Sequence, residues 1–199
     1  MLAAIFQPMQ KGNPMNKLVV FSSISVDGYF TDAHGDMSWA HRSDPEWDDF
    51  VAGNARQDST LLFGRVTYEQ MASFWPTPEG QRMAPDVAKG MNQAPKIVFS
   101  GSLEKATWSN TRLVKDDMPQ AVRALKRNQG RDLVVLGSGS VVSQLAQEDL
   151  VDEYRLVLVP VVLGAGRTLF DGLRQRVGLQ LVDTRRFENG NVVLGYRKA

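Results

Sequence analysis

The sequence contains no cysteine. The chain can therefore form neither a disulfide bond nor a metal site built on thiolates. Histidine is almost as scarce, because only His34 and His41 occur, both in a polar segment without a clustered carboxylate. We interpret the two histidines as solvated residues and predict no metal site. The lack of cysteine and of a His-x-Glu motif also excludes the zinc chemistry of nucleobase deaminases.

A long hydrophobic run and an excess of one charge are missing as well. No apolar segment approaches the roughly 20 residues that a membrane-spanning helix needs. The 23 Lys and Arg residues balance the 22 Asp and Glu residues, so we expect no broad basic surface for nucleic acid. We therefore predict neither a membrane nor nucleic acid as a partner, and a cytoplasmic location. With 199 residues, 43% of them hydrophobic, the chain can form one domain with a sizeable core.

The first fifteen residues lack the order of a secretory signal. A signal peptide has basic residues before a longer apolar region and a small-residue cleavage site. Here Lys11 follows the apolar part, which polar residues interrupt. We interpret residues 1–15 as a loose N-terminal extension, with Met15 as a candidate natural start, and residues 16–199 as a single domain.

Short apolar segments rich in β-branched residues alternate with segments of helical periodicity. Strands are predicted at residues 17–26, 59–63, 96–100, 111–114 and 133–136, and an apolar run follows at 156–163. Strands that alternate with helices are typical of a parallel sheet with helices on its faces. Two last strands, 179–187 and 192–197, meet at an Asn-Gly pair that predicts a hairpin. The fold class is therefore α/β, with a mixed, mainly parallel sheet and a C-terminal antiparallel hairpin.

Three helices are indicated by signals at their ends. Asp44 is suited to cap the first helix, since a proline follows it directly. The second helix is expected to begin at Thr67, which fits a capping box with Gln70. The third spans residues 118–128, with basic residues in its last turn. Residues 31–43 are polar and are predicted to form a loop.

A glycine-rich turn at residues 137–140 joins a predicted strand to a helix. A buried strand, a glycine turn and a helix start together present backbone N–H groups that bind anions. The turn is not a full dinucleotide fingerprint, because Val142 stands where the third glycine would be. It also lies about two thirds along the chain, so a classical Rossmann enzyme is disfavoured. A phosphate-bearing cofactor and a purely structural turn remain as alternatives.

Two other predicted strands end in residues that suit a phosphate. Gly64, Arg65 and Thr67 follow the strand at 59–63, and Ser100 ends the strand at 96–100. In α/β sheets, ligands bind outside the carboxyl ends of the strands. A guanidinium can contact phosphate through two hydrogen bonds, although a solvated surface arginine is the alternative. Three such strand ends favour one extended cofactor over a chance occurrence.

Five segments, in this order, resemble the dihydrofolate-reductase-like superfamily. They are SVDGYF (25–30), LLFGRVTYEQM (61–71), KIVFS (96–100), VVLGSGS (134–140) and PVVLGAGRTLF (160–170). Within the superfamily, the chain is most similar to bacterial stand-alone proteins that resemble the reductase domain of riboflavin biosynthesis. The resemblance covers about residues 16–198. It implies a single-domain dihydrofolate-reductase-like fold, and relatives in this branch imply a homodimer.

The resemblance also implies an activity and a cofactor. It points to an NADPH-dependent reductase of a small heterocyclic or carbonyl-bearing substrate. That substrate would be a pyrimidine of the riboflavin pathway or a pterin-like compound, so the enzyme would be similar to 5-amino-6-(5-phosphoribosylamino)uracil reductase or to dihydrofolate reductase. The implied cofactor contacts are Gly64, Arg65 and Thr67 at the phosphates, Ser100 at the adenosine ribose and 2′-phosphate, Gly137, Ser138, Gly139 and Ser140 at the pyrophosphate, and Ser23 beside the nicotinamide, over which Phe30 would close.

The catalytic residues are less well defined by the resemblance. Dihydrofolate reductases place a buried carboxylate on the first helix, and Glu46 is the best inward candidate there; an acid attracted by the helix dipole is the alternative. Asp27 is a candidate proton relay or substrate ligand, or else a turn former hydrogen-bonded to its own backbone. Trp39 is a candidate aromatic wall for a planar substrate. A nucleotide-binding module without turnover and a true dihydrofolate reductase remain the alternative functions.

Overall fold

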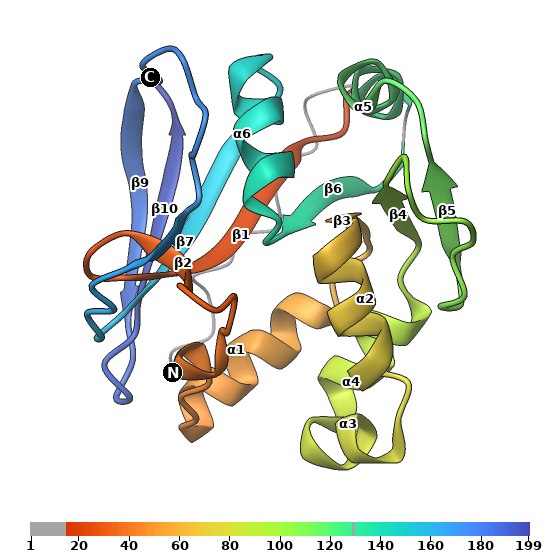
Figure 1. Cartoon of the computed structure of the whole chain (residues 1–199). Helices are drawn as coiled ribbons and strands as arrows, with labels where there is room; N and C mark the ends of the chain where they lie inside the picture. Colours follow the sequence, from red (N-terminus) through yellow and green to blue (C-terminus); the bar gives the residue numbers. More distant parts are fainter. Residues whose placement is uncertain (1–14, 129) are drawn as a thin grey trace.

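The computed structural model describes residues 15–128 and 130–199, so the predicted extension lies outside the described residues apart from Met15 (Figure 1). The central element is an eight-stranded sheet with the order β5-β4-β3-β6-β1-β7-β10-β9. Its strands are β1 (Leu18–Ser25), β3 (Ser59–Gly64), β4 (Lys96–Phe99), β5 (Thr111–Val114), β6 (Asp132–Leu136), β7 (Glu153–Val159), β9 (Leu179–Arg186) and β10 (Val192–Lys198).

The six strands from β5 to β7 in this order run parallel to one another. β10 pairs antiparallel with β7, and β9 pairs antiparallel with β10. β9 and β10 form the predicted hairpin, in which Val192 pairs with Arg186. The prediction of a mixed, mainly parallel sheet with a C-terminal antiparallel hairpin is therefore confirmed. Because parallel strands share one direction, their carboxyl ends lie along the same edge of the sheet.

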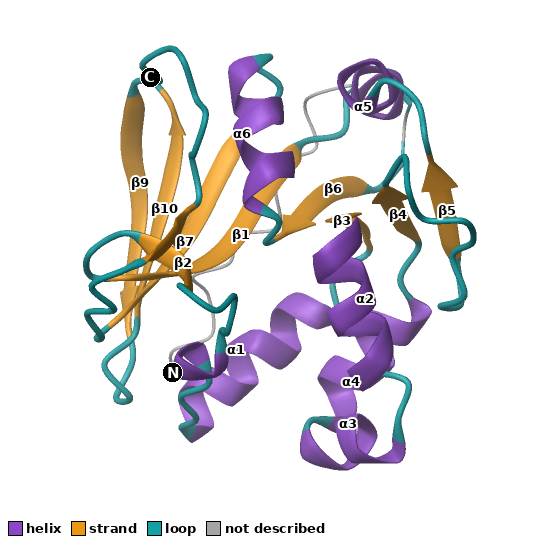
Figure 2. Ribbon diagram, in the orientation of Figure 1, coloured by secondary structure: helices purple, strands orange, loops and turns teal. Residues whose placement is uncertain are grey.

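Helices cover both faces of the sheet (Figure 2). They are α1 (Pro45–Ala55), α2 (Arg65–Phe74), α3 (Pro78–Met83), α4 (Pro85–Gln93), α5 (Met118–Arg127) and α6 (Gly139–Gln147), with a short 3-10 helix at Ser38–Ala40. α5 and α6 pack on one face, while α1, α2 and α4 pack on the other. None of the helices in the described ranges is long and apolar enough to cross a membrane.

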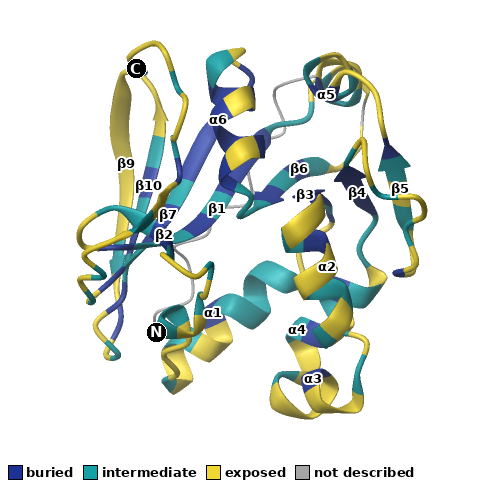
Figure 3. Cartoon of the chain, in the orientation of Figure 1, coloured by how far each residue is buried: buried dark blue, intermediate teal, exposed yellow. Residues whose placement is uncertain are grey.

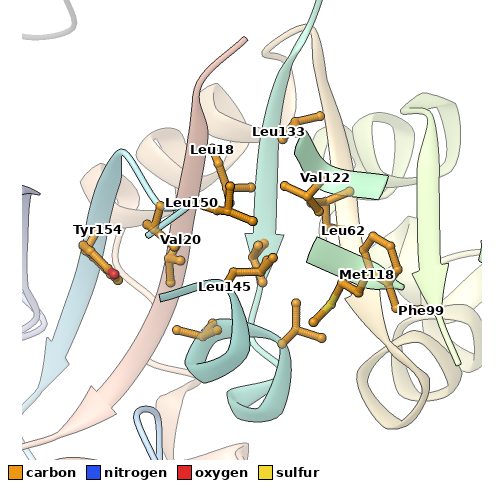
Figure 4. Close-up of a cluster of buried hydrophobic side chains, with 14 of the residues drawn as sticks. Leu18, Val20, Leu62, Phe99, Met118, Val122, Leu133, Leu145, Leu150 and Tyr154 are labelled. Carbon is orange, nitrogen blue, oxygen red and sulfur yellow. The ribbon is translucent and has the colours of Figure 1, made fainter. Parts of the chain in front are cut away.

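The core follows from the alternation of side chains along the strands. Leu18 and Val20 of β1 are fully buried and belong to the cluster beneath α5 and α6, together with Leu62, Leu133 and Leu145 (Figure 4). Phe21, the next residue along β1, packs instead with the cluster around α1 on the opposite face. The middle of the sheet is buried on both faces, whereas β9 is largely exposed (Figure 3).

A second, two-stranded sheet was not predicted. Its strands are β2 (Tyr29–Asp32) and β8 (Gly166–Thr168), which pair antiparallel. β2 therefore overlaps the predicted loop at 31–43, and that part of the prediction is wrong. The sequence gives no alternation here because the strands are short, and β2 shifts register between Tyr29 and Thr31. A Cβ atom on Gly166 would lie 2.0 Å from the Thr31 carbonyl oxygen, so the pairing requires glycine there.

The helix ends show one confirmed and one wrong prediction. Asp44 caps α1 as predicted, since its Oδ1 atom accepts the N–H of Trp47 at 2.9 Å. α2, however, begins at Arg65 rather than at Thr67, and its N-cap is Gly64 with no side-chain cap. The capping box fails because the Thr67 hydroxyl is hydrogen-bonded to Ser138, from the turn after β6.

Three further elements differ from the prediction. β7 begins at Glu153 and ends at Val159, whereas the apolar run that predicted it spans 156–163. α3 and α4 were not predicted, because they are short, with six and nine residues. α4 packs closely on α1, since a Cβ atom on Gly90 would lie 2.2 Å from the Ala55 carbonyl oxygen.

Candidate functional site

Four neighbouring strands end in the residues that the sequence suggests for a cofactor. Along the order β4-β3-β6-β1, the carboxyl ends carry Ser100, Gly64, the turn at 137–140 and the serines near the end of β1. Segments that are up to about a hundred residues apart in the sequence thus meet along one edge of the sheet (Figure 1). The structure therefore brings the predicted cofactor residues to a single region.

The N-termini of α2 and α6 both open at this edge. Gly64 is the N-cap of α2 and Ser138 is the N-cap of α6, and neither helix has a hydrogen bond from an N-cap side chain to its first turn. The first N–H groups of a helix have no partner within the helix, and the helix dipole makes this end partly positive. Two such ends side by side can bind two separate negative groups of one ligand.

Ser138 joins these two helix ends directly. Its Oγ atom accepts the N–H of Gly64 at 2.9 Å and donates to Oγ1 of Thr67 at 2.8 Å. Glycine favours this close approach, because a Cβ atom on Gly64 would lie 3.0 Å from the Ser138 hydroxyl and 3.2 Å from Val141. Three predicted cofactor residues therefore form one hydrogen-bonded group.

The two glycines of the turn at 137–140 are held from other sides. Gly137 has a φ of 61° and donates its N–H to the Phe21 carbonyl at 3.4 Å, which ties the turn to β1. A Cβ atom on Gly139 would lie 2.7 Å from the Phe30 ring, so Phe30 occupies the space beside it. Ser140 is the exposed member of the turn. Its hydroxyl and the free N–H groups of the first helical turn are therefore suited to contact an anion.

Arg65 and Ser100 retain groups that can contact a ligand. Arg65 pairs with Glu69 one turn along α2 at 2.8 Å, and both side chains are 44% exposed. An exposed pair of this kind is weak, so the guanidinium can turn toward a phosphate at little cost. The Ser100 hydroxyl oxygen accepts the N–H groups of Leu103 at 2.9 Å and Ser102 at 3.2 Å. Its hydroxyl hydrogen remains suited to donate to a ligand.

The comparison with known proteins agrees with this geometry. Residues 16–193 match the family model of the RibD C-terminal domain. The chain belongs to this family. The Bacillus subtilis (strain 168) protein YyaP, which is uncharacterised, is 29% identical to it over 182 residues, with 90% of this chain and 94% of YyaP covered.

Solved structures confirm the fold of this RibD C-terminal domain. A putative riboflavin biosynthesis protein from Shewanella sp. PV-4 superposes with a TM-score of 0.70 at 22% identity, covering 92% of this chain and 99% of that chain. Dihydrofolate reductase from Enterococcus faecalis, solved with NADP(H), superposes with a TM-score of 0.59 at 15% identity, covering 92% and 96%. The predicted dihydrofolate-reductase-like fold is thus confirmed.

Asp27 of this RibD C-terminal domain is bonded to the backbone of another segment. Its carboxylate accepts the hydroxyl of Ser25 at 2.6 Å, the N–H of Gly164 at 2.7 Å and the N–H of Leu163 at 3.1 Å. The Ser25 hydroxyl, followed by these N–H groups, lowers the pKa of Asp27 to about 2. The carboxylate is therefore ionised at neutral pH and joins the end of β1 to the loop after β7. Its predicted role as a proton relay or substrate ligand stays a prediction, which this geometry does not favour because N–H groups of a distant segment hold the carboxylate.

Glu46 lies near β9, at the opposite edge of the sheet from β4 and β5. It forms an ion pair of 2.8 Å with Arg185 of β9, and its side chain is 49% exposed. The Arg185 guanidinium also lies over the rings of Phe50 and Phe187, at 5.3 and 4.8 Å. Glu46 therefore links α1 to the C-terminal hairpin, and its predicted catalytic role stays a prediction that this geometry does not favour.

Ser23 and Trp39 lie near the opposite end of the same edge. Ser23 of β1 pairs in register with Val157 and is partly exposed. Trp39 packs against the aromatic cluster around Phe50, and its Nε1 donates to the Asp36 carbonyl at 3.1 Å. Both positions are compatible with the roles predicted for them, which stay predictions.

The segment before α1 is fixed by a set of contacts that the sequence does not predict. Asn189, in the β9–β10 turn, donates its N–H to Asp44 at 3.0 Å and its side-chain amide to the Arg42 carbonyl at 2.7 Å. The Nε atom of Arg42 donates to the Asn189 carbonyl at 3.0 Å. The Asn-Gly pair was read only as a hairpin signal, and no local pattern indicates that it also holds residues 42–44. Residues 42–44, which follow the segment that carries Trp39, are therefore held against the β9–β10 hairpin.

Proposed function

We propose that this chain is an NADPH-dependent reductase of a small heterocyclic or carbonyl-bearing substrate. The observation that carries the proposal is the meeting of the N-termini of α2 and α6 at the carboxyl edge of the sheet, joined by the Ser138 hydroxyl. NADPH carries a pyrophosphate and a separate 2′-phosphate, and two adjacent helix ends suit two such negative groups. Membership of the RibD C-terminal domain family and the likeness to a dihydrofolate reductase solved with NADP(H) support the same cofactor.

Different residues along the edge would contact different parts of the proposed cofactor. The first turn of α6, with Ser140, would hold the pyrophosphate, and Arg65 would pair with a phosphate at the start of α2. Ser100 would donate to the adenosine ribose or its phosphate, while Ser23 would lie beside the nicotinamide. When bound, the nicotinamide supplies the hydride, and the protein orients it and excludes water.

The proposed substrate is a planar ring of the pyrimidine or pterin type. It would lie between the end of β1 and the segment that carries Trp39, since an aromatic wall suits a planar heterocycle. Reduction of a C=N or C=O bond also needs a proton. Because Asp27 is held ionised by its three hydrogen bonds, we propose that a bound water delivers this proton.

A cofactor titration followed by turnover assays tests the proposal. NADPH is titrated into the full chain by calorimetry, and its oxidation is then followed with uracil-derived riboflavin precursors, with dihydrofolate and with simple carbonyl compounds. Binding together with oxidation on one class of substrate supports the reductase and names its substrate. Binding without oxidation across the whole panel identifies a nucleotide-binding module instead, and no binding overturns the proposal. We propose the cytoplasm, which supplies NADPH, as the place of action.

We also propose that the chain forms a homodimer through β9. This edge strand exposes Leu181 (51%) and Val182 (44%), and an uncovered edge is a template for pairing with another chain (Figure 3). Antiparallel pairing about a two-fold axis at Thr184 would set Asp183 opposite the Arg185 of a second copy. Light scattering should then give twice the monomer mass, and Val182→Asp should reduce it to the monomer mass. A monomer mass for the unaltered chain at all concentrations overturns the dimer.

A further inference from the structure

The contact between Gly64 and Ser138 replaces a rung of the sheet. The parallel ladder of β3 and β6 ends at the pair Leu62 and Val135. β6 then leaves the sheet, because Gly137 turns with a φ of 61°. The N–H of Gly64 therefore meets a side chain instead of a backbone carbonyl, and donates to the Ser138 hydroxyl at 2.9 Å.

The Ser138 hydroxyl is also committed as a donor. A serine hydroxyl has one hydrogen, and Ser138 donates it to Oγ1 of Thr67 at 2.8 Å. Thr67 lies in the first turn of α2, while Ser138 is the N-cap of α6. One side chain thus bridges two helix ends and has no hydrogen left for a phosphate oxygen.

This arrangement is maintained against an unfavourable backbone conformation. Ser138 has φ 64° and ψ 78°, in the left-handed region that glycine adopts without strain and other residues do not. Glycine would therefore be the favourable residue at this position if the turn served only to connect β6 to α6. The two hydrogen bonds of the serine hydroxyl offset the strain. They connect Ser138 to Thr67 and Gly64, which lie 71 and 74 residues earlier in the sequence.

We propose that Ser138 is a positioning residue that sets the spacing between the N-termini of α2 and α6. Its hydroxyl does not contact the ligand; it holds the two anion-binding ends at the separation that one dinucleotide requires. The inference rests on the proposed function, because it concerns a ligand that spans both helix ends. It differs from the role that the family resemblance implies for this residue, which is direct contact with the pyrophosphate.

A pair of glycine substitutions separates positioning from stability. Ser138→Gly removes the hydroxyl but also relieves the left-handed strain, so we expect the thermal midpoint to stay the same or rise. Loss of the two hydrogen bonds should still weaken NADPH binding by about fivefold to tenfold. Asp149→Gly is the matched control, because Asp149 has a φ of 55° at the other end of α6 and its side chain forms an exposed ion pair with Lys198. It should relieve the same kind of strain and leave the NADPH dissociation constant unchanged.

A second measurement reports on the hydrogen bond itself. In the absence of cofactor, amide exchange at Gly64 should be about tenfold faster in Ser138→Gly than in the unaltered chain, since its N–H loses its acceptor. Thr67→Val, which removes the other partner of the hydroxyl, should weaken NADPH binding in the same direction as Ser138→Gly. Equal NADPH affinity in Ser138→Gly and the unaltered chain overturns the inference, as does a loss of affinity that Asp149→Gly shares. An unaltered chain that does not bind NADPH overturns the proposed function and this inference with it.

Discussion

The ammonium group of Lys96 lies 4.5 Å from the ring centre of Trp108, at the start of β4 and away from the cofactor edge. Lys96 is 1% exposed and donates to the carbonyls of Met91 at 2.7 Å, Asn92 at 3.2 Å and Ala94 at 2.7 Å. These are the last carbonyls of α4 and its C-cap, which a cation stabilises through the helix dipole. The buried Lys96 side chain therefore caps the C-terminus of α4, the helix that packs against α1.

Lys96 should make the stability of the protein depend on pH in the alkaline range. Burial lowers its pKa from 10.5 to about 8, so between these values the unfolded state binds more protons than the folded state. Stability then rises with pH over this window, by about 3 kcal/mol. Tyr154 opposes this above pH about 10, because burial raises its pKa to about 12 and only the unfolded state ionises there.

Urea unfolding between pH about 8 and about 10 checks this expectation. The unaltered chain should become more stable across the window, whereas Lys96→Met should show no such rise. The variant should also be less stable by about 1–3 kcal/mol at neutral pH, because it leaves the carbonyls at the end of α4 without their donor. A rise of equal size in both proteins would contradict the assignment to Lys96.

Asp27 should contribute to stability in the opposite range of pH. Its pKa of about 2 lies below the ordinary value of 3.8, so its contribution is present above pH about 4 and is lost as the pH falls toward 2. Asp27→Asn should lower the midpoint of thermal unfolding at neutral pH and flatten its decrease in acid. Asp49→Asn, on the exposed surface of α1, is the control and should follow the unaltered profile. If Asp27 instead relays a proton, its variant would lose turnover while keeping its midpoint.

Arg65 should strengthen cofactor binding through its charge. Arg65→Ala is expected to weaken NADPH binding by about 1.5–3 kcal/mol, the range for a hydrogen bond to a charged group. Glu69→Ala serves as the control, because it removes the present partner of Arg65 without removing the guanidinium. Its dissociation constant should stay the same or fall. An unchanged constant for Arg65→Ala, measured by calorimetry, would remove this arginine from the site.

Ser22 and Ser25 should respond in opposite ways to loss of their hydroxyl groups. The Ser22 hydroxyl is buried without a hydrogen-bond partner among the described residues, so Ser22→Ala should leave stability unchanged or raise it by up to about 1 kcal/mol. The Ser25 hydroxyl donates to Asp27 and accepts the N–H of Tyr29 at 2.9 Å. Ser25→Ala should therefore destabilise the protein by about 1–3 kcal/mol. Urea unfolding of both variants side by side tests the difference, and equal losses would speak against it.

The sequence indicates the elements of this fold better than the contacts between them. Glycine and hydroxyl residues at the ends of apolar segments predicted which strand ends meet, because parallel strands direct their carboxyl ends to one edge. The hydrogen bond between Ser138 and Gly64 could not be predicted in this way, since it depends on the register of β3 and β6 and on where β6 leaves the sheet. A second long-range bond, from the Ser138 hydroxyl to the Thr67 hydroxyl, explains why Thr67 does not cap α2.

The catalytic candidates show a second limit of sequence reasoning. The family resemblance makes Glu46 a candidate and the SVDG motif makes Asp27 one, but their partners come from distant segments, Arg185 from β9 and the backbone after β7. A carboxylate in a motif carries no information about which remote donor will occupy it. The burial of Lys96 cannot be predicted from the sequence for the same reason. A buried lysine at the start of a strand is favourable only because the carbonyls at the end of α4 lie beside its ammonium group.

The position of β6 has a consequence for how the molecule assembles. In the described chain it is the strand that joins two groups, β5-β4-β3 on one side and β1-β7-β10-β9 on the other. It is made late, at Asp132–Leu136, yet pairs with strands that begin at Leu18 and Ser59. Pairings so far apart in the sequence form slowly. During synthesis β1 and β3 therefore cannot be joined into one sheet until β6 has been made. The turn at 137–140, which follows β6, reaches the start of α2 at the same step.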